Sequence, residues 1–238
     1  MSDYRRGLPL AAIWLGLPVL LTQGLRVRRE TVRLPDADGL TGAAGGGEPL
    51  NLVVLGDSVA AGVGVDHHRD TLAGQLARRL ATSRSRAVTW QVVALTGATA
   101  GDVLGLARRH AALASADVVV VSVGVNDTKN LHPDRRWRAE LAALLDHVLS
   151  VSPTAEVVLI GVPPMEAFPA LPRPLATLMG ARARRVDAIG RAVAAERPRV
   201  RRIELTLEQG EGLFAADGFH PSAVVHQRLA EQVCAVLC

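Results

Sequence analysis

Lysine, cysteine and aromatic residues are scarce in this chain of 238 residues. Lys129 is the only lysine, so almost all positive charge comes from arginine, and the formal net charge is a mild +4. No dense basic run stands beside stacking aromatics, which argues against nucleic-acid binding. Cys234 and Cys238 are four residues apart on a predicted helix, a spacing that suits neither a disulfide nor a complete zinc site. We therefore expect them to be free thiols.

Three common nucleotide-binding and catalytic motifs are also missing. The chain contains no phosphate-binding P-loop, and Gly62 and Gly64 lack the third glycine and the offset of a dinucleotide-binding fingerprint. Ala60 stands where the nucleophile elbow of α/β-hydrolases requires glycine. These absences disfavour three large enzyme classes.

The N-terminus carries an uncharged run over residues 8–25, flanked by arginines on both sides. Eighteen such residues are about the minimum for a membrane-spanning helix. No small-x-small cleavage site follows, which argues against a signal peptide. We expect residues 1–34 to form an anchor-like or interfacial segment. The arginines after the run favour a catalytic domain on the cytoplasmic face, with export as the alternative. A hydrophobic helix packed on the domain itself is the other reading.

Residues 35–50 are rich in glycine, proline and aspartate and lack apolar periodicity, which predicts a flexible linker. Residues 51–238 are then one domain, long enough to bury a sizeable core.

Short apolar runs alternate with helical patterns throughout this domain. Alternation of this kind predicts an α/β fold with parallel strands and helices on both faces of the sheet. The predicted strands cover residues 52–55, 88–95, 117–123, 157–162 and 200–205, and the predicted helices cover 70–80, 100–113, 134–149, 175–196 and 222–237.

Residues able to carry chemistry follow the first three strands. Gly56-Asp57-Ser58 follows the first strand and is expected to place Ser58 at the start of a helix, where exposed N–H groups favour negative charge. Thr96-Gly97 follows the second strand, and Gly124-Val125-Asn126-Asp127 follows the third. Loops at the carboxyl ends of parallel strands meet at one edge of the sheet, so we expect these three loops to converge.

A fourth loop carries Asp217-Gly218-Phe219-His220-Pro221. Its three-residue spacing can place a carboxylate against one nitrogen of an imidazole while the other nitrogen faces a nucleophile. Of seven histidines, only His220 has an acidic neighbour at this spacing in a loop that follows a strand. His67 and His68, close after Ser58, are the runners-up and could line the pocket.

Together these four blocks resemble the signature blocks of the SGNH hydrolases, also called GDSL esterases and lipases. The resemblance spans about residues 51–238 and implies a three-layer αβα, flavodoxin-like fold with a five-stranded parallel sheet. It implies a catalytic triad of Ser58, His220 and Asp217. The oxyanion hole would comprise the backbone N–H groups of Ser58 and Gly97 and the side chain of Asn126. The second block departs from the family pattern, which leaves Gly101 as an alternative to Gly97.

Serine chemistry of this kind predicts hydrolysis of carboxylic esters, or of thioesters, through an acyl-enzyme with no metal or organic cofactor. An acyltransferase using the same serine and a non-catalytic binding module are the alternatives. Residues 163–180 are apolar and proline-rich and are expected to roof the pocket. We therefore expect small or acyl-chain, lipid-like substrates, contact with a membrane surface through residues 8–25, and no nucleic-acid partner. The oligomeric state is left open.

Overall fold

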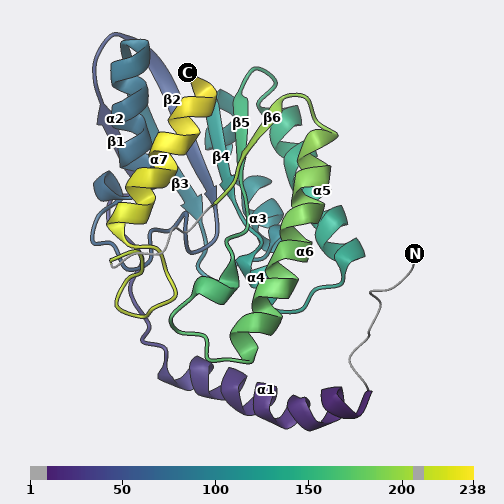
Figure 1. The fold of residues 1–238 in the computed structure, drawn as a ribbon. Coiled ribbons are helices and arrows are strands. Elements are labelled where there is room, and N and C mark those ends of the chain that lie inside the picture. The colour runs from purple at the N-terminus through teal and green to yellow at the C-terminus, as the bar shows by residue number, and fades with distance from the viewer. Residues whose placement is uncertain (1–9, 206–211) are drawn as a thin grey trace, which may run out of the picture.

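The computed structural model describes residues 10–205 and 212–238 of the chain. Its centre is a six-stranded sheet with the strand order β1-β3-β2-β4-β5-β6 (Figure 1). Strands β2 to β6 run parallel to one another, and β1 is antiparallel to its neighbour β3. The strands are β1 (Thr41–Ala44), β2 (Glu48–Gly56), β3 (Arg86–Ala94), β4 (Val118–Ser122), β5 (Glu156–Ile160) and β6 (Val200–Ile203).

Helices cover both faces of this sheet and make a three-layer α/β/α domain (Figure 1). One face is covered by α2 (Leu72–Arg84) and α7 (Ala223–Leu237), and the other by α3 (Ala100–Ala107), α5 (Asp134–Val151) and α6 (Leu175–Ala195). Successive side chains of a strand point to opposite faces, so β2 serves both cores. Leu52 and Val54 belong to the core under α2 and α7, and Val53 and Leu55 to the core on the other side. The predicted three-layer α/β fold is confirmed.

The prediction of five parallel strands misses β1. Thr41-Gly42-Ala43-Ala44 has no large apolar side chains and no alternation, so nothing in its composition marks a strand. Gly42 lies against the Trp90 ring of β3, where any side chain would collide with the indole. The sheet therefore has six strands and is mixed, because a strand of small residues pairs with β3 at its edge.

The segment 35–50 differs from the flexible linker that its composition predicts. It contains β1, and β2 begins within it at Glu48, so the ordered domain starts before residue 51. Backbone hydrogen bonds join Ala37 to Ala61 (3.0 Å) and Asp38 to Asp66 (3.0 Å), and the Thr96 hydroxyl donates to Asp36 (2.6 Å). Gly39, Gly45 and Gly47 have positive φ and shape the chain on both sides of β1.

The five parallel strands, taken in chain order, are arranged 2-1-3-4-5, which is the flavodoxin-like order. The connection leaves β2 for β3 on one side and then returns to β4 on the other, so the direction of winding reverses between β2 and β4. In open α/β sheets, ligands bind outside the carboxyl ends of the strands at this switch point. The loops after β2 and β4 carry Ser58 and Asn126.

Helix α1 (Leu10–Glu30) lies across the end of the domain to which the parallel strands point (Figure 1). Gln23 fixes it there, because its side chain donates to the Arg173 carbonyl (2.7 Å) and accepts from the first backbone N–H of α6, that of Leu175 (3.1 Å). Leu20 and Val27 pack against the core. Within the described residues, no helix combines the length and apolar character that a bilayer span requires. The described part of α1 thus packs on the domain.

Candidate active site

Ser58 stands two residues after the end of β2. Gly56, the last residue of the strand, lies so close to the Ser122 carbonyl of β4 that a side chain would collide with it. The expected helix does not follow directly: residues 57–64 form turns, and α2 begins only at Leu72. Gly62 and Gly64 have positive φ, which ends the single helical turn that starts at Asp57. The prediction that Ser58 opens a regular helix is wrong.

Asp217 and His220 form a close pair in the loop before α7. The Asp217 Oδ2 and His220 Nδ1 atoms are 2.5 Å apart, and Oδ1 accepts the backbone N–H groups of Phe219 (2.9 Å) and His220 (3.0 Å). Burial would raise the pKa of the Asp217 carboxyl, but these hydrogen bonds outweigh it and hold the pKa below its usual range. Asp217 is therefore a fixed carboxylate that orients the imidazole.

The candidate oxyanion-hole residues lie in two loops joined by a hydrogen bond. Asn126 is buried in the first turn of the short helix α4 (Val125–Lys129), and its Nδ2 donates to the Ala98 carbonyl (2.9 Å). Gly97, next to Ala98, is exposed and has a φ of +86°. Gly101, the alternative donor, lies within α3 against the Glu140 side chain. This arrangement favours Gly97 over Gly101.

Ser58 and His220 line one narrow cavity, and among the described residues they are its only hydrophilic side chains. The cavity has a volume of about 30 Å³, room for little more than one water molecule. Among the described residues no hydrogen bond joins the Ser58 hydroxyl to the His220 ring, and such contacts often tighten only when substrate is bound. The rest of the lining is apolar: Val59, Val125, Pro163, Phe168, Leu205, Phe214, Phe219, Pro221, Val225 and Leu229.

The loops that follow β2 and β4 thus lie with His220 around one cavity at the switch point of a flavodoxin-like sheet, and Asn126 joins the loop after β3 to them. The sequence profile of the GDSL-like Lipase/Acylhydrolase family matches residues 54–228, most of the chain. The chain belongs to this family. No curated protein sequence matches the chain significantly.

Solved structures show the same fold at low sequence identity. The lipase Lip_vut3 from a goat rumen metagenome superposes with a TM-score of 0.64 at 17% identity, over 78% of this chain and 96% of that one. A lipase/acylhydrolase from Enterococcus faecalis gives 0.63 at 21% identity, over 79% and 95%. TesA gives 0.61 at 22% identity, over 79% and 97%. This family member therefore shares the architecture of GDSL hydrolases along nearly their whole length.

Asp57, the middle residue of the family's Gly-Asp-Ser motif, braces the loop of the nucleophile. It is 1% exposed, and its Oδ1 accepts from the Val59 backbone N–H (3.1 Å) and the Ser122 hydroxyl (3.4 Å). Burial raises the pKa of the Asp57 carboxyl to about 7. The side chain does not line the cavity, which fits a structural role.

The other histidines near the site have structural contacts, and His68 and His226 are buried. His67 accepts from the Arg69 backbone N–H (3.0 Å), and the His68 ring contacts the Thr71 hydroxyl (3.0 Å); neither of these runners-up lines the cavity of Ser58. His226 is fully buried and accepts from the Leu72 backbone N–H (3.2 Å). Burial lowers the pKa of His226 to about 3, so the ring is neutral.

One group of described side chains has ligand atoms close enough to hold a metal ion: Asp127, His132 and Glu140, within 4.8 Å of one another. Both Asp127 oxygens and Glu140 Oε1 already have partners, whereas the buried Glu140 Oε2 has none among the described residues. Asp127 accepts from the His132 ring (3.0 Å) and from the Ala100 backbone N–H (3.1 Å), and Arg136 donates to Glu140 (2.8 Å). The Arg136 charge opposes a cation here. That the reaction needs no metal or cofactor stays a prediction.

Sequence reasoning assigned no role to phenylalanine, yet all three phenylalanines of the chain line the cavity. The Phe168 ring packs edge-on against Phe214 (5.3 Å between centroids) and Phe219 (5.0 Å). Phe219 also packs against the His220 ring (5.3 Å). Pro163 and Phe168 come from the segment 163–180 that was predicted to roof the pocket. The signal in the sequence that could have found them is that the chain has only three phenylalanines and that all three lie in segments near the motifs.

Proposed function

We propose that this GDSL family member is a serine hydrolase that cleaves carboxylic esters of apolar acyl groups through an acyl-enzyme intermediate. The observation that carries the proposal is His220, which is held by Asp217 and lines the same cavity as Ser58. A serine hydroxyl needs a base within reach, and an imidazole fixed by a carboxylate supplies one.

In the acylation step, Ser58 Oγ attacks the carbonyl carbon of the ester while His220 Nε2 accepts the hydroxyl proton. The carbonyl π electrons move to the oxygen and form a tetrahedral oxyanion. When the intermediate collapses, the bond to the alcohol breaks and His220 donates its proton to the leaving alkoxide. Asp217 stabilises the imidazolium between these two steps. Water repeats the sequence to release the acid and restore Ser58.

The oxyanion would be held by the backbone N–H groups of Ser58 and Gly97 and by the Asn126 carboxamide. An amide nitrogen carries two hydrogens, and only one is used on Ala98, so one N–H is left for substrate. Loss of one such donor typically costs about 3–4 kcal/mol of transition-state stabilisation.

The apolar lining of the cavity supports an apolar acyl group as the part of the substrate beside Ser58, and the cavity, at about 30 Å³, must widen to admit it. Oxygen esters and thioesters form the same acyl-enzyme, and an acyltransferase differs only in the acceptor that attacks it. A chain-length series of p-nitrophenyl esters and acyl thioesters, with and without added alcohols, separates these activities. The expected outcome is hydrolysis of apolar acyl esters with little transfer to alcohols.

The decisive experiment compares the wild type with Ser58→Ala and His220→Ala. Ser58→Ala should keep its fold by circular dichroism and lose turnover and fluorophosphonate labelling. His220→Ala should keep the hydroxyl but lose labelling, because the base is gone. Full turnover by folded Ser58→Ala would overturn the proposal, and so would undiminished labelling of His220→Ala.

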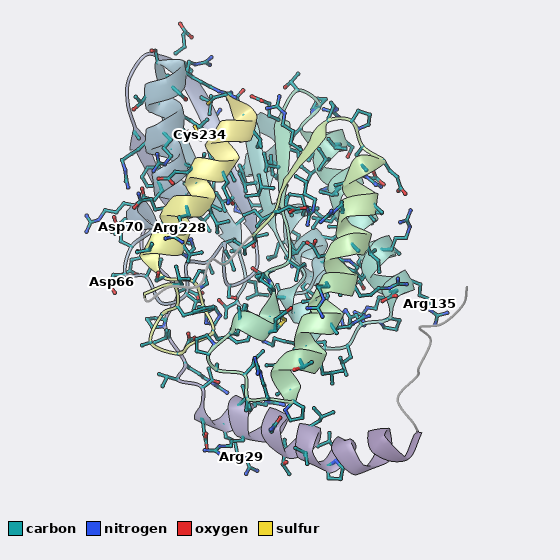
Figure 2. All side chains as sticks on the ribbon, viewed as in Figure 1. Arg29, Asp66, Asp70, Arg135, Arg228 and Cys234 are labelled. Atoms are coloured by element: carbon teal, nitrogen blue, oxygen red, sulfur yellow. The ribbon has the colours of Figure 1, made fainter. Side chains whose placement is uncertain are left out.

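We also propose that α1 rests on an anionic membrane surface beside the active site. Its inner face packs on the domain, while its outer side exposes Leu21 and Leu25 together with Arg28 and Arg29. Figure 2 shows Arg29 on the outer side of α1. Apolar and cationic side chains on one face are typical of helices that lie in the membrane interface. The cytoplasmic leaflet carries the anionic lipids that such a face attracts, which supports a cytoplasmic location.

A further inference from the structure

The only lysine of the chain, Lys129, lies between Asn126 and the loop that carries His220. Lys129 ends α4, the helix that carries Asn126, and its Nζ donates to Asn126 Oδ1 (3.2 Å). The same Nζ lies over the Phe219 ring, 5.1 Å from the centroid. Phe219 directly precedes His220. The ammonium thus touches both the oxyanion side chain and the loop of the catalytic base.

The contacts of Lys129 and Ala98 fix which way the Asn126 carboxamide points. An ammonium can only donate hydrogen bonds, and a backbone carbonyl can only accept them. Only one orientation of the amide satisfies both neighbours, with Oδ1 on Lys129 and Nδ2 on Ala98. The reversed amide would set N–H against ammonium and oxygen against oxygen. Lys129 therefore selects the orientation that turns the N–H groups toward the Gly97 loop.

The same contact strengthens the donor. A positive charge on Oδ1 withdraws electron density from the amide, which makes its N–H groups better donors. Asn126 is 4% exposed, whereas Lys129 is exposed, so the amide is shielded from water while solvent screens part of the ammonium charge. An oxyanion forming at Nδ2 would benefit from both the orientation and the polarisation.

We propose that Lys129 is a positioning residue of the oxyanion hole, acting on the reacting carbonyl through the Asn126 carboxamide. The inference rests on the proposed function, since it concerns the same serine chemistry. Every other basic side chain outside the histidines is an arginine, so the single lysine stands out. Its hydrogen bond to Asn126 gives it a role in the site.

The charges around Lys129 set the pH range of this role. Burial lowers the pKa of Lys129, while Asp57, in the loop after β2, favours the charged form of the ammonium. The loop before α7 presents the Phe219 ring and, beyond it, the Asp217–His220 pair. On α4 itself, Asp127 is paired with His132. Activity should therefore decline at alkaline pH as Lys129 loses its proton, below the ordinary range of a lysine.

Steady-state hydrolysis of a p-nitrophenyl ester by the full chain tests the proposal. Lys129→Met should lower kcat by about tenfold or more, less than the hundred- to thousandfold typical of losing a donor outright, and change KM by less than about twofold. Lys129→Arg should restore most of kcat and move the alkaline limb of the pH profile upward, since arginine keeps its charge. Arg135→Met removes an exposed positive charge on α5 (Figure 2) and should leave kcat unchanged.

A double-mutant cycle shows whether Lys129 acts through Asn126. In an Asn126→Ala background, Lys129→Met should change kcat by less than about twofold. Equal effects of Lys129→Met in both backgrounds would overturn the inference. A wild-type kcat for folded Lys129→Met would also overturn it. If Lys129→Met does not fold, Lys129→Gln takes its place in this comparison. Absent hydrolysis by the wild type would instead refute the proposed function, because the inference predicts only differences between active variants.

Discussion

The Asp217 carboxylate holds the His220 ring with one oxygen and the His220 backbone with the other. Orientation of the ring and shape of the loop therefore depend on the same side chain but on different atoms. Substitutions at Asp217 can separate these two contributions.

Asp217→Asn should keep the loop and lose the chemistry. An asparagine Oδ1 can still accept the two backbone N–H groups, but its amide nitrogen faces the His220 ring and imposes the wrong tautomer. We expect kcat to fall by about 10⁴-fold, as in serine hydrolases of related geometry, with little change in Tm. Ester hydrolysis and thermal unfolding measured side by side check this.

Asp217→Ala is the matched control, because it removes both contacts. It should lose activity to a similar extent and also lower the Tm, since two part-buried N–H groups lose their acceptor. A kcat of the Asp217→Asn variant within tenfold of the wild-type value would contradict the role given to the carboxylate.

Phe168→Ala should lengthen the preferred acyl chain. Phe168 is 5% exposed and packs on both other phenylalanines of the narrow cavity, so its removal opens space beside Ser58. Loss of a buried phenylalanine also costs about 3–5 kcal/mol of stability. A series of p-nitrophenyl esters of increasing length, read as kcat/KM, checks this. The preferred acyl-chain length of Phe168→Leu should fall between those of the wild type and Phe168→Ala. An unchanged preferred chain length for folded Phe168→Ala would show that the acyl chain binds elsewhere.

Asp57 should make the protein less stable as pH rises. The pKa of this carboxyl is about 7 in the folded chain, against an ordinary value of 3.8. Between these values the folded state binds more protons than the unfolded state, so the free energy of unfolding falls with rising pH and the loss is complete above about pH 7. Three pKa units correspond to about 4 kcal/mol as an order of magnitude.

Asp57→Asn tests this pH dependence, because it keeps an oxygen for Val59 and Ser122 and removes the titration. Urea unfolding at several pH values should show the variant gaining on the wild type from pH 5 to pH 8. A difference in unfolding free energy that stays constant over this range would rule out the buried, protonatable carboxyl.

Vesicle binding should depend on the outer side of α1. Basic residues near an anionic bilayer contribute about 1 kcal/mol each, so Arg28→Gln with Arg29→Gln should weaken binding to phosphatidylserine vesicles markedly. Co-sedimentation at low and high salt measures it, with neutral vesicles for comparison. Arg135→Gln is the matched charge control. Equal binding of all three proteins to anionic vesicles would argue against α1 as the contact.

Much of this architecture follows from patterns in the sequence. The leucines at 72, 76 and 80 mark α2, and the β-branched run 118–121 marks a strand buried on both faces. Motif spacing located Ser58, Asn126 and His220 because each follows a strand of a parallel sheet. The predicted roles of these residues are open to the experiments above.

Other features depend on contacts that no local pattern encodes. In strand β1, Gly42 has no room for a side chain because the Trp90 ring lies against it. The turns after Ser58 arise from positive φ at Gly62 and Gly64, where the sequence reads as a helix start. The hydrogen bond between Lys129 and Asn126 lies within one helical turn. Its effect on the orientation of the Asn126 amide, however, depends also on the Ala98 carbonyl, which comes from a loop distant in the sequence.

Strand β1 shields the only neighbour it has. Without residues 41–44, the nine-residue strand β3 would present an unpaired row of N–H and C=O groups, a template on which another chain can add. A recombinant fragment that begins at residue 51, the domain boundary predicted from composition, would expose this unpaired edge of β3 and should aggregate. Fragments for crystallisation therefore ought to start at or before residue 35.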